Sequence, residues 1–168
     1  SVRQSVGYMP DNFGVYDGMK VWEFLDFFAV AYKIGKGKRK QVINDVLELL
    51  DLGHKRDDYV NGLSRGMKQR LCMAKTLVHD PPVLILDEPT VGLDPKQIVA
   101  IRELIRELGR RHTLLLSTHI LPEVELLCGR VLIFDRGRIV AEGSPDQLRE
   151  RLQGQVAVTV EFAAAASG

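Results

Sequence analysis

Short apolar runs that stop at polar residues predict three strands. Residues 83–86 form a continuous apolar run, with prolines on both sides, that ends at Asp87 and Glu88. Such a run is typical of a strand buried on both faces of a parallel sheet. Residues 113–116 repeat the pattern, and residues 6–10 give a further short strand.

Apolar residues at helical spacing predict the helices between and after these strands. The predicted helices cover residues 20–32, 38–52, 64–79, 94–108, 122–127 and 144–152. In the second of these helices, the spacing places Val42, Val46, Leu49 and Leu50 on the buried face, and Gly53 is the expected end.

Strands that alternate with helices predict an α/β fold built on a parallel sheet. Residues 14–80 are largely helical and interrupt the series of strands, so we expect a helical lobe inserted into an α/β core. Residues 131–141 predict a β-hairpin. We expect one domain over residues 1–154, and residues 155–168 should begin a C-terminal extension or tail.

Composition excludes few classes of protein, but it limits the expected binding partners and cellular compartment. The 168 residues carry a net charge of +1, which does not indicate nucleic acid or an anionic surface as a partner. Cys72 and Cys128 match no metal or redox spacing and fit reduced thiols in the cytosol. No segment approaches the ~18 apolar residues of a membrane span. The basic cluster at residues 36–40 has a solvated loop as its default interpretation; a contact to RNA or lipid headgroups is the alternative.

Two neighbouring carboxylates follow the strand at residues 83–86. Ligands of open parallel sheets bind beyond the carboxyl ends of the strands, which is where Asp87 and Glu88 should lie. A strand with a polar turn would be common, but it does not explain two adjacent acids that repel each other. A divalent cation at one acid and a polarised water at the other would explain them. His119 follows the strand at residues 113–116 and should lie at the same edge.

The start of the predicted helix at residues 64–79 is a candidate anion site. Ser64 is a typical N-cap, and Gly66 would let a ligand approach the exposed backbone N–H groups at the positive end of the helix dipole. Taken alone, a well-capped helix with a chance glycine explains the pattern equally well.

Several ordered motifs together resemble the ATP-binding cassette (ABC) ATPases. The resemblance covers nearly the whole chain. The motifs are residues 63–69, similar to the family signature; residues 84–88, similar to Walker B; residues 91–94, similar to the D-loop; and His119, similar to the switch histidine. The resemblance implies a P-loop NTPase-like core, RecA-like in its sheet, with residues 14–80 as the helical signature subdomain.

The resemblance also implies roles for the residues at the sheet edge, with ATP and Mg²⁺ as cofactors. Asp87 would hold Mg²⁺ through water, Glu88 would polarise the attacking water, and His119 would contact the γ-phosphate. Glu88 and His119 are therefore the expected catalytic residues.

A second ABC ATPase subunit is implied as well. Ser64 and Gly66 would bind the γ-phosphate of nucleotide held by that subunit, and Asp94 would cross the dimer interface. A local N-cap role is by itself a sufficient explanation for Asp94.

Two positions depart from the family pattern. Asp11 stands where the family usually has a glutamine that senses Mg²⁺, and we hypothesise that its carboxylate still reaches the metal shell. Arg65 replaces the first of the two usual signature glycines, so its side chain must point away from the phosphate.

No G-x-x-x-x-G-K-[ST] P-loop occurs anywhere in the sequence. In the family this Walker A motif lies N-terminal to the region where this chain begins. We therefore expect the sequence to be part of a longer protein, and we expect the 168 residues alone to bind ATP poorly and not to hydrolyse it.

The favoured function is that of an exporter's nucleotide-binding subunit at the cytoplasmic face of the membrane. The resemblance implies a transmembrane permease as partner, and the aromatic residues 22–28 are a candidate docking surface. A soluble ABC ATPase acting on DNA or ribosomes is the alternative, but no sustained heptads occur and no nucleic-acid partner is expected. An inert module is the third class; the presence of Glu88 and His119 argues against it.

Overall fold

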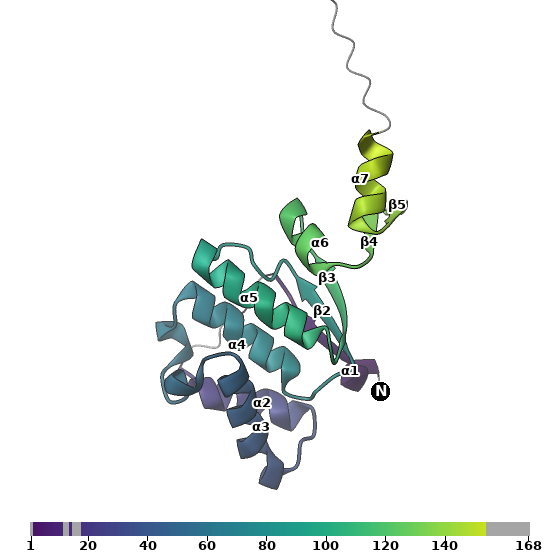
Figure 1. Cartoon of the computed structure of the whole chain (residues 1–168). Helices are drawn as coiled ribbons and strands as arrows, with labels where there is room; N and C mark the ends of the chain where they lie inside the picture. Colours follow the sequence, from purple (N-terminus) through teal and green to yellow (C-terminus); the bar gives the residue numbers. More distant parts are fainter. Residues whose placement is uncertain (1, 12–13, 15–17, 154–168) are drawn as a thin grey trace, which may run out of the picture. The chain divides into compact units, whose positions relative to one another are not determined.

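The computed structural model describes residues 2–11, 14 and 18–153 (Figure 1). The chain divides into two compact units, Ser1–Ile120 and Leu121–Gly168. The helices are α1 (Val2–Ser5), α2 (Val21–Ala31), α3 (Lys36–Leu49), α4 (Arg65–Leu77), α5 (Pro95–Leu108), α6 (Leu121–Leu127) and α7 (Pro145–Gln153), with short 3₁₀ turns at Gly53–Lys55 and Val60–Gly62. The strands are β1 (Val6–Met9), β2 (Val83–Asp87), β3 (Thr113–Ser117), β4 (Val131–Asp135) and β5 (Arg138–Gly143).

The first unit contains a parallel sheet in the order β1-β2-β3. Because β2 is central, its carboxyl end lies between those of β1 and β3, with Asp87 paired to Ser117. The predicted α/β class with a parallel sheet is confirmed. This order brings the residues that follow β2 and β3 to one edge.

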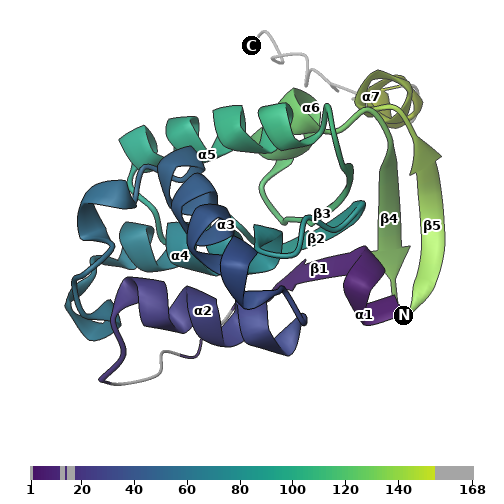
Figure 2. The ribbon, with the colours of Figure 1, turned by 90° about the horizontal axis from the view of Figure 1, so that it is seen from below.

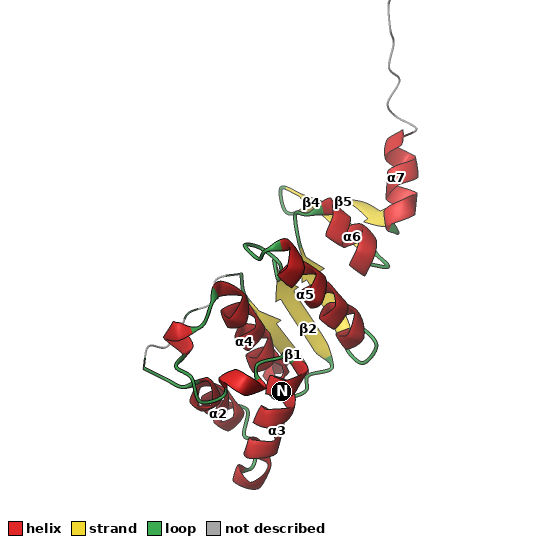
Figure 3. Ribbon diagram, turned by 60° about the vertical axis from the view of Figure 1, so that its left-hand side comes forward, coloured by secondary structure: helices red, strands yellow, loops and turns green. Residues whose placement is uncertain are grey.

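Helices α4 and α5 cover one face of this sheet (Figure 3). Leu84 and Leu86 of β2 are fully buried on that face, together with Met9 of β1. Close contact between α4 and β1 requires a glycine, because a Cβ at Gly7 would lie 2.7 Å from the carbonyl oxygen of Thr76. The position of β1 is therefore set by direct backbone contact with α4.

Within these 168 residues, the strand at residues 83–86 is buried on one face and only partly buried on the other. The opposite face of the described sheet leaves Tyr8 and Leu115 about half exposed, 51% and 54% respectively. Residues 83, 85 and 87 on that face are only partly buried.

Helices α2, α3 and α4 pack against one another. Phe24 and Leu25 of α2 and Leu47 of α3 form part of their core. Ring stacking of Tyr32 on His79, with centroids 3.6 Å apart, ties the end of α2 to the residues after α4.

Helix α3 differs from its prediction in length and in its buried face. It ends at Leu49 because Asp51 adopts a left-handed backbone with φ of 54°, which lets the Leu52 N–H bond to the Leu47 carbonyl. Its buried residues are Ile43, Val46 and Leu47. Of the four residues predicted to face inward, Val46 and Leu50 are buried, whereas Val42 and Leu49 are only partly buried.

The second unit contains the predicted hairpin of β4 and β5, paired in antiparallel fashion (Figure 2). Helix α7 begins with a capping box, in which the Ser144 hydroxyl accepts from the Gln147 N–H and the Gln147 side chain accepts from the Ser144 N–H. The expected extension at residues 155–168 lies outside the described residues. Among the described helices, each is too short or too polar to cross a lipid bilayer.

Candidate nucleotide and metal site

The carboxylate of Asp87 is held from both sides at the end of β2. Its Oδ1 accepts a hydrogen bond from the Ser117 hydroxyl on β3, and its Oδ2 accepts from the Tyr8 hydroxyl on β1 at 3.3 Å. All three residues lie on the open face of the sheet, since their register positions have the same parity. The three strands together therefore orient this carboxylate.

Glu88 follows with an unusual backbone. Its φ is 47°, in the left-handed region that non-glycine residues seldom occupy, and its N–H donates to the Ser117 carbonyl at 3.0 Å. Strain of this kind persists only where the surrounding structure imposes it, and it is concentrated at functional sites. From this turn the side chain of Glu88 reaches His119.

The imidazole of His119 and the carboxylate of Glu88 form a direct contact. Nδ1 of His119 lies 2.7 Å from Oε1 of Glu88. A carboxylate can only accept, so Nδ1 carries the proton and donates it to this bond. The side chain of Glu88 is 21% exposed and that of His119 is 73% exposed. The histidine therefore holds an enclosed carboxylate from the solvent side.

The second oxygen of Glu88, Oε2, is buried and has no hydrogen-bond partner among the described residues. A buried polar atom without a partner is costly and calls for a missing group such as a water or an ion. Glu88 is the residue after Asp87, so this atom belongs to the carboxyl end of β2, where a ligand is expected. The arrangement fits a bound water or the shell of a cation.

Carboxylate oxygens such as those of Asp87 can bind Mg²⁺ when a substrate supplies the remaining ligands. No cluster of three or more His, Cys, Asp or Glu side chains that could hold a metal occurs in the described part of the chain. Mg²⁺ is usually held by one or two carboxylates together with substrate phosphates and waters. One oriented carboxylate at Asp87 is therefore compatible with Mg²⁺ bound with nucleotide.

Asp11 acts on this cluster through its charge. The pKa of the Tyr8 phenol is raised, first by loss of solvation, then by the Asp87 carboxylate that accepts its hydrogen bond, and to a smaller extent by Asp11. Asp11 lies two residues beyond the end of β1 and is exposed. The structure therefore brings Asp11 within electrostatic reach of Tyr8, and its predicted contact with the metal shell stays a hypothesis.

The residues predicted to form an anion site lie at the start of α4. The Ser64 hydroxyl accepts from the Met67 N–H at 3.3 Å, which confirms the predicted N-cap. Ser64 itself is exposed. Gly66 is buried, and a Cβ there would lie 2.6 Å from the side-chain amide of Gln97. The backbone at the helix start thus packs closely on α5.

The same helix is fastened to the loop that leaves Glu88. The side-chain amide of Gln69 donates to the Pro89 carbonyl at 3.0 Å in a buried bond. Arg65 lies with its guanidinium against Gly92, which has φ of 73°. Asp94 then caps α5 by accepting from the Gln97 N–H at 2.9 Å, as its local pattern predicts.

The predicted site residues therefore form two groups. Asp87, Glu88 and His119 meet at the carboxyl ends of β2 and β3, with Asp11 in reach. Ser64, Gly66 and Asp94 lie on the α4 start and on the loop at residues 89–94, which connects the two groups.

Sequence reasoning missed Tyr8, Ser117 and Gln69 as parts of this site. Tyr8 and Ser117 could have been found from strand parity, since both share a sheet face with Asp87 once the register is known. Gln69 lies within the signature-like residues 63–69, but its bond to Pro89 depends on how α4 packs against the sheet.

Comparison with known proteins decides the family. Residues 1–91 match the family described as ABC transporter. The chain belongs to the ABC transporter family. The P-loop NTPase-like fold expected from the resemblance agrees with the solved ABC structures that the chain matches.

Named relatives of this ABC chain include an export ATP-binding protein and a resistance ATP-binding protein. It is 41% identical over 149 residues to a Nod factor export ATP-binding protein I of Rhizobium sp. (strain N33), covering 88% of this chain and 49% of that protein. It is 34% identical over 157 residues to the linearmycin resistance ATP-binding protein LnrL of Bacillus subtilis (strain 168), covering 93% of this chain and 50% of LnrL. The chain thus spans about half the length of these relatives.

The solved structure of cbiO1 from Clostridium perfringens, part of the ABC transporter complex cbiONQ, superposes with a TM-score of 0.78. The two sequences are 31% identical, and the match covers 91% of this chain and 62% of cbiO1. The ABC fold therefore extends over nearly all of the 168 residues.

Proposed function

We propose that this chain is part of the ATP-hydrolysing subunit of an ABC transporter and that its site binds ATP with Mg²⁺. The observation that carries the proposal is the contact of 2.7 Å between His119 Nδ1 and Glu88 Oε1 beside the oriented Asp87 carboxylate. An acid held in place, with a second oxygen that has no partner among the described residues, is suited to orient a water molecule and to accept its proton.

Each residue at the sheet edge has a distinct role in this proposal. Asp87 would hold Mg²⁺, and the hydroxyls of Ser117 and Tyr8 would keep its carboxylate in one orientation. Mg²⁺, when bound with ATP, supplies positive charge that neutralises the phosphates. Glu88 would orient the attacking water through its unpartnered oxygen. His119 would donate a hydrogen bond from Nδ1 to Glu88 and so fix the direction of that carboxylate.

The start of α4 is proposed to serve a second ABC subunit. Ser64 and Gly66 lie where backbone N–H groups and the helix dipole favour an anion, which in a dimer would be the γ-phosphate held by the other subunit. Asp94 would lie at the same interface. The buried bond from Gln69 to Pro89 supports a joint role, because it links this helix to the loop that carries Asp94.

A transmembrane permease is the proposed membrane partner, and the site of action is the cytoplasmic face of the membrane. The similarity to a Nod factor export protein supports an export role, and the cbiONQ complex offers an example of a cassette assembled with other components. Phe27 and Val30 of α2 are about half exposed. Phe27 belongs to the aromatic stretch at residues 22–28, which is the proposed docking surface, and Val30 lies just beyond it.

Glu88→Gln in the protein that carries this chain tests the catalytic assignment. Glutamine keeps the shape of the side chain and an oxygen for His119 but cannot take a proton, so ATP turnover should fall by about 10²–10⁴-fold. Nucleotide binding should persist. Glu107→Gln, on the exposed side of α5, removes the same charge away from the site and should leave turnover unchanged. Undiminished turnover in Glu88→Gln would remove Glu88 from its role.

The isolated 168 residues are proposed to lack ATPase activity. The sequence holds no P-loop motif, so the backbone cradle for the β- and γ-phosphates is missing from it. Comparison of ATP turnover by this chain with that of the longer protein would test the point, and turnover with micromolar ATP affinity in the chain alone would contradict it.

A further inference from the structure

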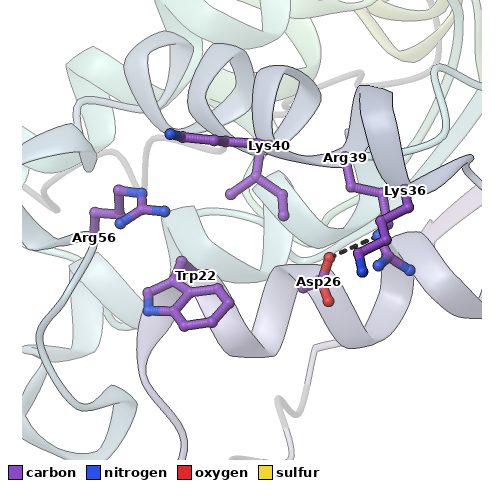
Figure 4. Close-up of a pocket in the computed structure, with 7 residues that line it drawn as sticks. Trp22, Asp26, Lys36, Arg39, Lys40 and Arg56 are labelled. Carbon is purple, nitrogen blue, oxygen red and sulfur yellow. Dashed lines mark ion pairs between the residues drawn. The ribbon is translucent and has the colours of Figure 1, made fainter.

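A pocket of about 240 Å³ opens between α2 and α3, in the helical lobe (Figure 4). Its lining comes from α2, from α3 and from the turn that follows α3. The lining residues are Trp22, Asp26, Lys36, Arg39, Lys40, Ile43 and Arg56. The residues proposed above for ATP and Mg²⁺ do not contribute to it.

Four of the seven lining side chains are cationic and one is acidic. The acid is already used, since Asp26 pairs with Arg39 at 3.0 Å. Arg56 pairs with Asp57 at 3.0 Å, and its guanidinium also lies 5.6 Å from the centre of the Trp22 ring. The pocket therefore has an excess of positive charge beside one aromatic face.

Lys36 and Lys40 have no carboxylate within ion-pair distance in the described part of the chain. In Figure 4 the side chain of Lys40 extends from α3 on the side of the pocket opposite Trp22, and that of Lys36 lies toward the other end, beside Arg39 and Asp26. A solvated lysine needs no partner, but two of them next to two arginines repel one another. An anion placed among them would relieve this repulsion.

The position of these cations on α3 increases the same effect. Its first turn contains no acidic residue, and Lys36, Lys38 and Arg39 stand at its N-terminal end. The macrodipole makes this end positive, so cations there are unfavourable and an anion is favourable. Acidic residues in the first turn would stabilise the helix, whereas α3 has cations there.

We propose that this pocket binds a phosphate monoester group. A phosphate carries up to two negative charges and several acceptor oxygens, so it can satisfy cations that reach it from two elements, whereas a carboxylate has one charge and two oxygens. The volume of about 240 Å³ is below the range of about 300–1,000 Å³ for drug-sized ligands, so the pocket suits the phosphate itself and a small attached group.

Trp22 supplies the assay, because it is the only tryptophan in the 168 residues. Inorganic phosphate, titrated at constant ionic strength against sodium chloride, should change Trp22 fluorescence in a saturable manner. Lys36→Gln and Lys40→Gln should each weaken the apparent affinity by about tenfold, the effect of one charge-assisted hydrogen bond. Lys38→Gln is the matched control: it removes the same charge from the same turn but does not line the pocket, and should change the affinity less than about twofold.

Two further titrations identify the source of the phosphate. Glycerol 3-phosphate tests a soluble ligand, and phosphatidylcholine vesicles with and without phosphatidate test a lipid headgroup. Saturation by either one that is weakened by Lys40→Gln supports the proposal. Equal loss in Lys38→Gln and Lys40→Gln would overturn it, since that is general charge attraction. Absence of any phosphate-dependent change, or binding to RNA in preference to phosphate, would overturn it as well. The circular dichroism of each variant verifies that the helices are intact.

Discussion

Gly7→Ala should destabilise the chain because it separates β1 from α4. An added Cβ would lie 2.7 Å from the Thr76 carbonyl oxygen and 2.8 Å from the Pro81 ring and the Thr76 methyl. The nearest atom belongs to the backbone of α4, so the contact cannot be relieved by a side-chain rotation. Overpacking of this kind costs about 1–3 kcal/mol. The melting temperature should fall by about 2–4 °C for each kcal/mol.

Gly37→Ala is the matched control with the opposite expected sign. Gly37 lies in α3, and an added Cβ there meets no atom within 4 Å. Alanine in an open helical position gains about 0.5–1 kcal/mol over glycine. Urea unfolding followed by circular dichroism at 222 nm would compare the two variants with the parent chain.

The outcome that refutes the reasoning is a Gly7→Ala variant as stable as the parent or more stable. It would mean that α4 does not press on β1 at this point and that Tyr8, the next residue, is placed by other contacts. If both variants lost stability equally, the substitution itself rather than the contact would be the cause.

Two titration predictions concern buried groups. Burial lowers the pKa of His79 below its ordinary 6.5, so the folded state binds fewer protons than the unfolded state near that pH. Its contribution to stability is therefore present above pH 6.5 and is lost as the pH falls through the folded-state pKa. Between pH 8 and pH 5, the urea midpoint should fall less in His79→Gln than in the parent chain. The same dependence of the midpoint on pH in both proteins would contradict this. Burial also raises the pKa of the Cys72 thiol to about 11, whereas Cys128 is only partly buried. A thiol reagent at pH 8 should thus modify Cys128 first, and faster reaction in Cys128→Ser than in Cys72→Ser would show the reverse order.

The parts of the site that the sequence predicted correctly are those set by local rules. Ser64 and Asp94 cap their helices because a hydroxyl or carboxylate at that position accepts a backbone N–H three residues on. Glu88 and His119 meet because each follows a parallel strand, and adjacent parallel strands end at one edge. These results need only spacing and the direction of the strands.

The predictions that failed concern which surfaces become covered. Periodicity limits the apolar face of α3 to a broad stripe, but the positions of α2 and α4 decide that Ile43 and Leu47 point inward. The sequence of β2 is apolar at every position from 83 to 86. It therefore does not indicate which of these residues face the helices, and the partial burial of Ile85 could not be predicted.

For this protein the order of motifs along the chain was enough to determine the α/β class, the two helix caps and the meeting of an acid with an imidazole, because these follow from neighbouring residues and strand direction. Only the tertiary structure assigned Tyr8 and Ser117 to the Asp87 carboxylate, Gln69 to Pro89 and Arg65 to Gly92. Each of these contacts joins elements that are distant in the sequence, and their partners are chosen by how helices pack on the sheet, which no local pattern records.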